Sequence, residues 1–204
     1  MSEGLVLYRA LATRSFTALW MLEELRVPYR SEIVGVEDRR NAYLALNPTG
    51  MVPTLADGPA VVREAPAICM YLADRYSYGG LAPRIEAPTR GAYLSWLVYA
   101  TAQLEPAQAT QSVSIPAIPG MWGPGWEPLP QVIGVLAQAL EGRPYLLGDQ
   151  FSAADVMVGS ALIMRLHTQE VPPEPVLVAY AERLGERAAC KRAGELNWPA
   201  SSPT

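Results

Sequence analysis

Few side chains of this sequence could carry out thiol, metal or proton-transfer chemistry. The chain has two cysteines, Cys69 and Cys190, and one histidine, His167. Two cysteines without a C-x-x-C spacing provide no disulfide framework. A single histidine argues against a His-rich metal site and against most histidine-based triads. The sequence therefore predicts that the protein binds no metal.

Two hydroxyl groups, those of Thr13 and Ser15, lie between an apolar run and a helical pattern. The run is GLVLY at 4–8, and apolar side chains then recur at spacings of three and four through SFTALWMLEELRV at 15–27. Either hydroxyl could cap this helix by accepting a hydrogen bond from a free N–H. Arg14, between them, is a candidate positive neighbour for an anion.

Ser152 and Asp155 form the most specific local pattern in the chain. The spacing S-x-x-D ahead of an apolar run is typical of a capping box, in which each residue satisfies the other's free N–H. This pattern predicts that a core helix begins at about 153. Asp155 is therefore expected to be structural and not a catalytic acid.

The first part of the chain alternates strand and helix patterns. Strands at 4–8 and 29–34 flank the helix 15–27, which predicts a βαβ unit with parallel strands. The segments that follow are a polar helix at 37–46, two short strands at 51–57 and 60–64 around Gly58-Pro59, and a helix from Pro66 to Tyr76. This order predicts a small α/β domain over 1–77.

The second part contains no convincing strand. After a Gly- and Pro-rich linker at 78–87, a long helix is expected at 88–112, with Pro106 kinking or ending it. The further helices expected are 129–141, 153–168 and 175–188, after an apolar loop at 115–130 that contains Met121, Trp122 and Trp126. Apart from Trp198, the tail LNWPASSPT is expected to be loosely held. We therefore predict an all-helical domain over 88–204.

The composition limits the partners and the compartment. Sixteen Lys and Arg against twenty Asp and Glu give a net charge of -4, with no basic run. Such a chain is a poor candidate for binding nucleic acid or an anionic membrane. The N-terminus lacks a signal-peptide pattern, and no apolar run is long enough to span a bilayer. We expect a cytoplasmic protein.

Four segments, in order, resemble the cytosolic glutathione S-transferase family, particularly its bacterial members. They are SFTALWMLEELRVPYRSEIV, LNPTGMVPTLAD, VVREAPAICMYLADRY and GDQFSAADV. The resemblance covers nearly the whole chain with the expected spacing. It implies a thioredoxin-like N-terminal domain followed by an all-helical C-terminal domain, in agreement with the division made from the pattern alone.

The resemblance implies a glutathione site in the first domain. Val52-Pro53 would be a cis peptide whose valine backbone pairs with the cysteinyl part of glutathione. Glu64 would hold the γ-glutamyl amine, and the residue after it the carboxylate. Here Ala65 replaces the family's serine, so only its backbone N–H remains for that carboxylate. Met51 stands where many members carry a basic residue.

The resemblance also implies a hydroxyl or thiol donor just after the first strand, because the thiol of free glutathione is mostly protonated at neutral pH. Ser15 and Thr13 are the candidates, and a backbone N–H or no activation at all are the alternatives. Ala12 falls where some classes place their catalytic serine. Tyr8, Tyr99 and Gln103 are the candidates for the acceptor-substrate site.

The function implied is attack by the glutathione thiol on a small apolar electrophile, in a protein that forms a homodimer. The alternative is a non-catalytic ligand-binding or protein-interaction member of the same fold with a degenerate site. The absence of a cysteine from 9–15 argues against a thiol-disulfide or peroxide enzyme.

Overall fold

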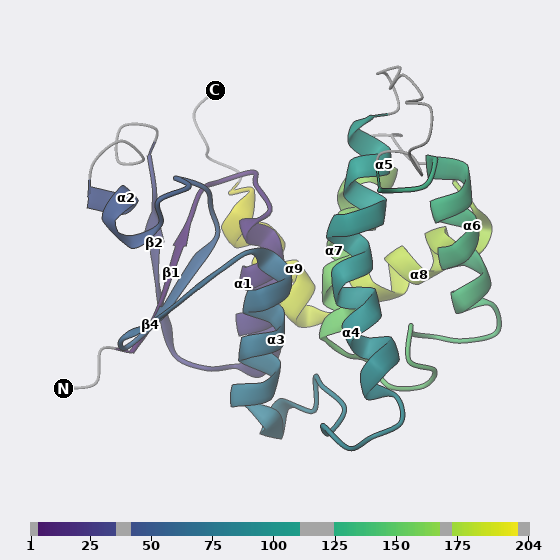
Figure 1. Cartoon of the computed structure of the whole chain (residues 1–204), viewed down its shortest axis with the longest axis horizontal. Coiled ribbons are helices and arrows are strands. Elements are labelled where there is room, and N and C mark those ends of the chain that lie inside the picture. The colour runs from purple at the N-terminus through teal and green to yellow at the C-terminus, as the bar shows by residue number, and fades with distance from the viewer. Residues whose placement is uncertain (1–3, 36–41, 111–124, 168–172, 200–204) are drawn as a thin grey trace. The chain divides into compact units, whose positions relative to one another are not determined.

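The computed structural model describes residues 4–35, 42–110, 125–167 and 173–199 (Figure 1). The chain forms two compact units. The first consists of the chain up to Leu81 together with the C-terminal segment from Glu186, and the second runs from Ala82 to Gly185. The boundary at Leu81 falls inside the predicted linker. Among the described residues, no helix is long and apolar enough to cross a membrane.

A four-stranded sheet organises the first unit, in the order β2-β1-β3-β4. The strands are β1 (Leu5–Arg9), β2 (Tyr29–Ile33), β3 (Thr54–Asp57) and β4 (Ala60–Arg63). β1 and β2 are parallel, as predicted, and β3 is antiparallel to both β1 and β4. The continuous apolar run of β1 fits its central place, where Leu5, Val6 and Leu7 are buried.

The helices of the first unit are α1 (Ser15–Leu25), α2 (Ala42–Leu46), α3 (Ala65–Arg75) and α9 (Ala188–Asn197). Nine of the eleven residues of α1 are buried, which fits a helix enclosed by neighbouring elements. It ends earlier than predicted because Arg26 adopts a left-handed conformation, with φ of 53°. Of the predicted helix 37–46, only the part from residue 42 lies within the described residues.

α9 was not predicted, and it alters the expected division of the chain. Figure 1 shows α9 in yellow beside α1 in purple, and the contacts place it in the first unit. The apolar pattern of this segment is weak because its buried side chains are small: Ala189, Cys190 and Ala193. The segment after 186, expected to belong to the helical domain, thus packs with the α/β unit.

The second unit is helical. Its elements are α4 (Arg90–Tyr99), a π-helical turn (Ala100–Leu104), α5 (Glu105–Ala109), α6 (Leu129–Leu140), α7 (Ala153–His167) and α8 (Pro175–Gly185). The predicted helix 88–112 thus continues past Pro106 through a widened turn. A widened turn suits a proline, which has no N–H to offer and whose ring crowds the carbonyl of Ala102. The predicted loop 115–130 lies mostly outside the described residues.

Candidate functional site

The strand register brings three loop segments of the first unit to one edge of the sheet. Tyr8 of β1 pairs with Thr54 of β3, and Thr54 pairs with Arg63 of β4. Because β3 is antiparallel to both neighbours, β1 and β4 end where β3 begins. Three segments meet at this edge: the loop 10–15, the Val52-Pro53 peptide and the Glu64-Ala65 turn. The structure therefore brings to one edge of the sheet the candidate site residues of the first domain, which are far apart in the sequence.

Thr13 and Ser15 are joined by a network of hydrogen bonds inside their loop. The Thr13 hydroxyl lies 2.8 Å from the Ala10 carbonyl oxygen, to which it donates, and 3.0 Å from Ser15 Oγ. Ser15 Oγ accepts from the Ala10 N–H at 3.3 Å, and the Ser15 N–H donates to Thr13 Oγ1 at 3.2 Å. The network fixes both hydroxyl groups relative to the start of α1.

The two hydroxyls differ in their access to a ligand. Ser15 is fully buried, with 0% of its surface exposed, whereas Thr13 is half-buried. A group bound at this edge could therefore touch Thr13 and not Ser15. The N-cap position of α1 is Arg14, whose side chain makes no capping bond, and the Thr13 hydroxyl accepts from the first N–H of the helix, that of Ser15. Of the two residues, Thr13 is thus the better placed to donate to a bound thiolate.

The Val52-Pro53 peptide is cis, which confirms that expectation. Two buried side chains, Tyr43 and Asn47, hold the residues on either side of it. The Tyr43 hydroxyl donates to the Met51 carbonyl at 2.6 Å, and the Asn47 amide donates to the same oxygen at 2.8 Å and to Thr54 Oγ1 at 3.0 Å. Sequence reasoning missed these supports, although the Asn-Pro-Thr-Gly run contained one of them.

The Glu64-Ala65 turn has an unusual backbone conformation. Glu64 has φ of 65° and ψ of 127°, a region that residues other than glycine rarely adopt. It is exposed and occupies the N-cap position of α3, but no side chain caps this helix terminus. Ala65 is buried and begins the helix. An N-terminus with uncapped N–H groups beside an exposed carboxylate suits a ligand that carries both an anion and an amine.

Tyr8, the first acceptor-site candidate, belongs to this edge of the sheet. Its half-buried ring lies 5.9 Å from that of Tyr43, between ring centroids. Tyr8 is the next-to-last residue of β1, and its ring therefore lies beside Tyr43, one of the two side chains that support the cis peptide.

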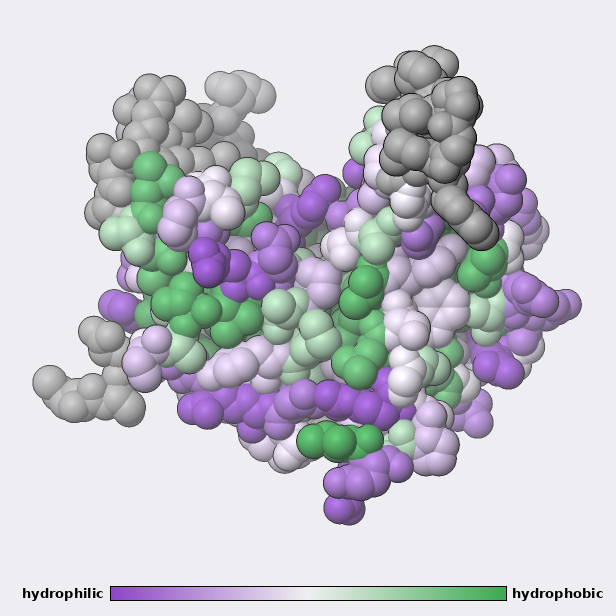
Figure 2. All heavy atoms as spheres, viewed as in Figure 1, coloured by the Kyte–Doolittle hydropathy of each residue, from purple (hydrophilic) through white to green (hydrophobic). Residues whose placement is uncertain are grey.

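Tyr99 and Gln103, the other acceptor-site candidates, line one open hollow of about 460 Å³ in the second unit. The remaining lining residues are Leu94, Ser95, Val98 and Ala102. Leu94 and Val98 are exposed, and an apolar patch is visible over α4 in Figure 2. This mostly apolar lining suits an apolar ligand.

The polar ends of Tyr99 and Gln103 are already occupied. The Tyr99 hydroxyl donates to the Val132 carbonyl at 3.2 Å. Burial, together with the nearby Glu127 carboxylate, raises the pKa of Tyr99, so this hydroxyl keeps its proton at neutral pH. The Gln103 amide donates to the Gly125 carbonyl at 3.1 Å and accepts from the Glu127 N–H at 2.9 Å. The polar groups of both side chains thus make hydrogen bonds within the second unit.

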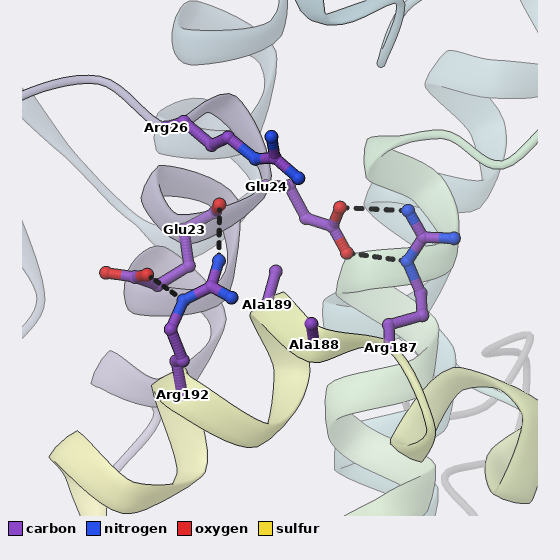
Figure 3. A pocket seen from close by; sticks show the side chains of 7 residues that line it. All are labelled: Glu23, Glu24, Arg26, Arg187, Ala188, Ala189 and Arg192. Atoms are coloured by element: carbon purple, nitrogen blue, oxygen red, sulfur yellow. Dashed lines mark hydrogen bonds and ion pairs between the residues drawn. The ribbon is translucent and has the colours of Figure 1, made fainter.

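A charged hollow of about 260 Å³ lies between α1 and α9 (Figure 3). Arg187 makes two hydrogen bonds to Glu24, of 2.6 and 2.8 Å, and Arg192 bonds Glu23 Oε2 at 2.7 Å. Arg26, Ala188 and Ala189 complete the lining. Because both carboxylates are paired, this cluster joins the N-terminal half of α9 to the end of α1.

The two cysteines are placed for packing. Cys69 and Cys190 are free thiols, both buried, and burial raises the pKa of each to about 12. Since the thiolate is the reactive species, neither should react quickly at neutral pH. Among the described residues, no group of three or more His, Cys, Asp or Glu side chains is placed to hold a metal ion.

A thiol-specific chromogenic reagent should therefore label neither cysteine of the native protein on the timescale on which it labels both in denaturant. The two absorbance traces, recorded on the same sample with and without urea, provide the comparison. Rapid labelling of the native protein would contradict the packing described for Cys69 and Cys190.

The comparisons with known proteins place the chain in a family. The glutathione S-transferase N-terminal domain matches residues 14–75, and the glutathione S-transferase C-terminal domain matches residues 82–183. The chain belongs to the glutathione S-transferase family, which confirms the resemblance found in the sequence. The thioredoxin-like first unit and the helical second unit agree with this assignment.

Individual relatives extend over most of the chain. Glutathione S-transferase F10 of Arabidopsis thaliana is 30% identical over 166 residues, which are 74% of this chain and 76% of the relative. The theta class glutathione S-transferase from Xanthomonas axonopodis pv. citri, solved with glutathione bound, is 31% identical, with a TM-score of 0.74. The match covers 95% of this chain and 97% of that structure. The bacterial enzyme BphK, solved as a ternary complex, is 28% identical, has a TM-score of 0.79, and is matched over 94% of this chain and 98% of its own.

Proposed function

We propose that this protein is a glutathione transferase, which activates the thiol of glutathione for attack on a small apolar electrophile. The observation that carries the proposal is the strand register of the first unit. It sets a hydroxyl-bearing loop, a cis peptide and an uncapped helix terminus beside an exposed glutamate, all at one edge of a sheet.

Glutathione would bind in an extended conformation along this edge. The backbone of Val52 offers an N–H and a C=O for strand-like pairing with the cysteinyl part. The Glu64 carboxylate would pair with the γ-glutamyl amine. The γ-glutamyl carboxylate would accept the Ala65 N–H at the N-terminus of α3, where the free N–H groups and the helix dipole favour an anion.

The thiolate would be stabilised by Thr13. On binding, the Thr13 hydroxyl turns from the Ala10 carbonyl to the sulfur, and the Ser15 hydroxyl can donate to Thr13 across the same 3.0 Å contact. A hydrogen bond to a charged group contributes about 1.5–3 kcal/mol, which lowers a thiol pKa by roughly one to two units. The N-terminus of α1 acts in the same direction.

The reaction itself needs no further group from the protein. The thiolate supplies the electron pair for the new sulfur–carbon bond, and the leaving group departs with the electron pair of the bond that breaks. The apolar hollow that includes Tyr99 and Gln103 suits an apolar acceptor. The sequence analysis predicts a homodimer and a cytoplasmic location, and both stay predictions. Sedimentation velocity tests the homodimer.

Replacing Glu64 with glutamine should weaken glutathione binding about tenfold. The substitution keeps the size of the side chain but removes the charge that pairs with the amine, and a charge-assisted hydrogen bond contributes about 1.5 kcal/mol or more. Calorimetric titration with reduced glutathione measures the change.

Two further variants make this test specific. Glu186→Gln removes an exposed carboxylate just before α9, which pairs with Lys191 and not with the proposed site, and should leave the affinity unchanged. Ala65→Ser restores the hydroxyl that the family carries and should tighten binding about fivefold, which corresponds to about 1 kcal/mol for one hydrogen bond. Equal affinities for the Glu64→Gln and Glu186→Gln variants would rule out the proposed cleft.

A further inference from the structure

The C-terminal end of α9 is bonded to the loop that carries Thr13. The Ala12 N–H donates to the Asn197 carbonyl at 3.0 Å, and the Asn197 side-chain amide donates to the Thr13 carbonyl at 3.1 Å. Beside them, Arg9 Nη1 donates to the Leu196 carbonyl at 3.1 Å. Two successive residues of α9 therefore bind the chain on both sides of Ala12.

Ala12 adopts a conformation that alanine does not favour. Its φ of 53° lies in the left-handed region, where the Cβ atom crowds the following carbonyl. Such a conformation persists when its surroundings determine it. The hydrogen bonds that join Asn197 to Ala12 and Thr13 hold Ala12 in this conformation from outside the loop.

The side chain of Asn197 is fully buried and only partly satisfied. Its Nδ2 donates to the Thr13 carbonyl, which fixes the orientation of the amide. Its Oδ1 is buried and has no hydrogen-bond partner among the described residues. A buried acceptor without a partner is costly, and an apolar residue of similar size would avoid the cost. The bond to Thr13, rather than packing, therefore accounts for an amide at this position.

α9 is joined to α1 along its length. At its other end the Glu24–Arg187 and Glu23–Arg192 pairs join it to α1 (Figure 3). Near Asn197, the ring of Trp198 lies 5.1 Å from that of Phe16, in the first turn of α1. The loop is thus enclosed between the start of α1 and the end of α9.

We propose that Asn197 is a positioning residue for thiol activation, which holds the loop 10–15 so that the Thr13 hydroxyl reaches the sulfur of bound glutathione. The inference rests on the proposed function. Asn197 acts through Thr13 and does not touch glutathione itself.

The test compares Asn197→Leu with Leu196→Ala. Leucine is close to asparagine in size but cannot donate to Thr13. Among the hydrogen bonds described, Leu196 contacts Arg9 only through its main-chain carbonyl, so Leu196→Ala keeps that bond. Leu196 is 40% exposed. The readouts are the pKa of the bound glutathione thiol, from its thiolate absorbance, and the affinity for S-methylglutathione, which has no thiol to ionise.

Asn197→Leu should raise the pKa of the bound thiol by about one unit, which lowers turnover at neutral pH about tenfold, and turnover should recover as the pH rises. Its affinity for S-methylglutathione should stay within about twofold of wild type, and Leu196→Ala should change neither quantity. An unchanged thiol pKa in Asn197→Leu, or a loss of turnover that is equal at every pH, would overturn the inference. If Asn197→Leu fails to fold, Asn197→Ser, whose hydroxyl is too short to reach Thr13, takes its place with the same expectations.

The wild-type protein separates failure of the inference from failure of the proposed function. A wild-type site that does not lower the thiol pKa of bound glutathione contradicts the proposed function. A lowered pKa in the wild type that Asn197→Leu retains contradicts only the role of Asn197.

Discussion

Thr13→Val is expected to lower kcat/KM at neutral pH by about 10- to 100-fold. Valine has the shape of threonine but no hydroxyl, so the bound thiolate loses a hydrogen bond that contributes about 1.5–3 kcal/mol. The pKa of the bound thiol should rise by about one to two units, and the thiolate fraction should fall in proportion. Turnover measured against pH with a chromogenic aromatic electrophile should therefore recover above the raised pKa.

Thr13→Ser is the matched control, because it keeps the hydroxyl and should keep most of the activity. Ser15→Ala should have a smaller effect than Thr13→Val, since the fully buried Ser15 acts only through Thr13. A pH profile of Thr13→Val that coincides with the wild-type profile would assign activation to another donor, such as a backbone N–H.

Asp155→Ala is expected to lower the free energy of unfolding by about 4 kcal/mol, the largest stability effect we predict. The fully buried Asp155 carboxylate accepts four hydrogen bonds. They come from the Leu146 N–H, the Ser152 N–H, the Ser152 hydroxyl and the Tyr180 hydroxyl, at 2.8 to 3.0 Å. Alanine would leave these donors without an acceptor in the interior of the second unit.

Asp149→Ala provides the comparison, because Asp149 is exposed in the same loop region and its loss should cost little. Thermal unfolding followed by circular dichroism should give a Tm about 8–16 °C lower for Asp155→Ala than for wild type. Glutathione affinity, which we assign to the first unit, should not change in the folded Asp155→Ala protein. Equal Tm values for the two variants would contradict the described network.

Local patterns predicted much of the architecture. Apolar runs and helical spacing identified the strands and most helices, because each pattern is contained in a short stretch of chain. The Ser152–Asp155 pattern identified the start of α7 for the same reason. In the structure, Asp155 reaches back to the Ser152 N–H as in a capping box, and the Ser152 hydroxyl donates to Asp155.

The remaining features depend on contacts between distant segments. α9 was missed because its buried residues are small and give a weak apolar pattern, and its bonds to the loop 10–15 join residues that are more than 180 positions apart. Burial distinguishes Ser15 from Thr13, which were both candidates on the sequence. Asn47 lies in the Asn-Pro-Thr-Gly run, but neither it nor Tyr43 carried a local signal that it supports the Val52-Pro53 peptide.

Calorimetric titration with reduced glutathione, repeated in buffers of different ionisation enthalpy, tests the central claim most directly. Free glutathione is mostly protonated at neutral pH, with a thiol pKa of about 8.5. If the site at the sheet edge lowers the thiol pKa by one to two units, saturable binding at pH 7 should release about 0.2 to 0.7 proton per chain, whereas S-methylglutathione should bind without that release. Absence of saturable binding, or equal proton release by the two ligands, would contradict the account.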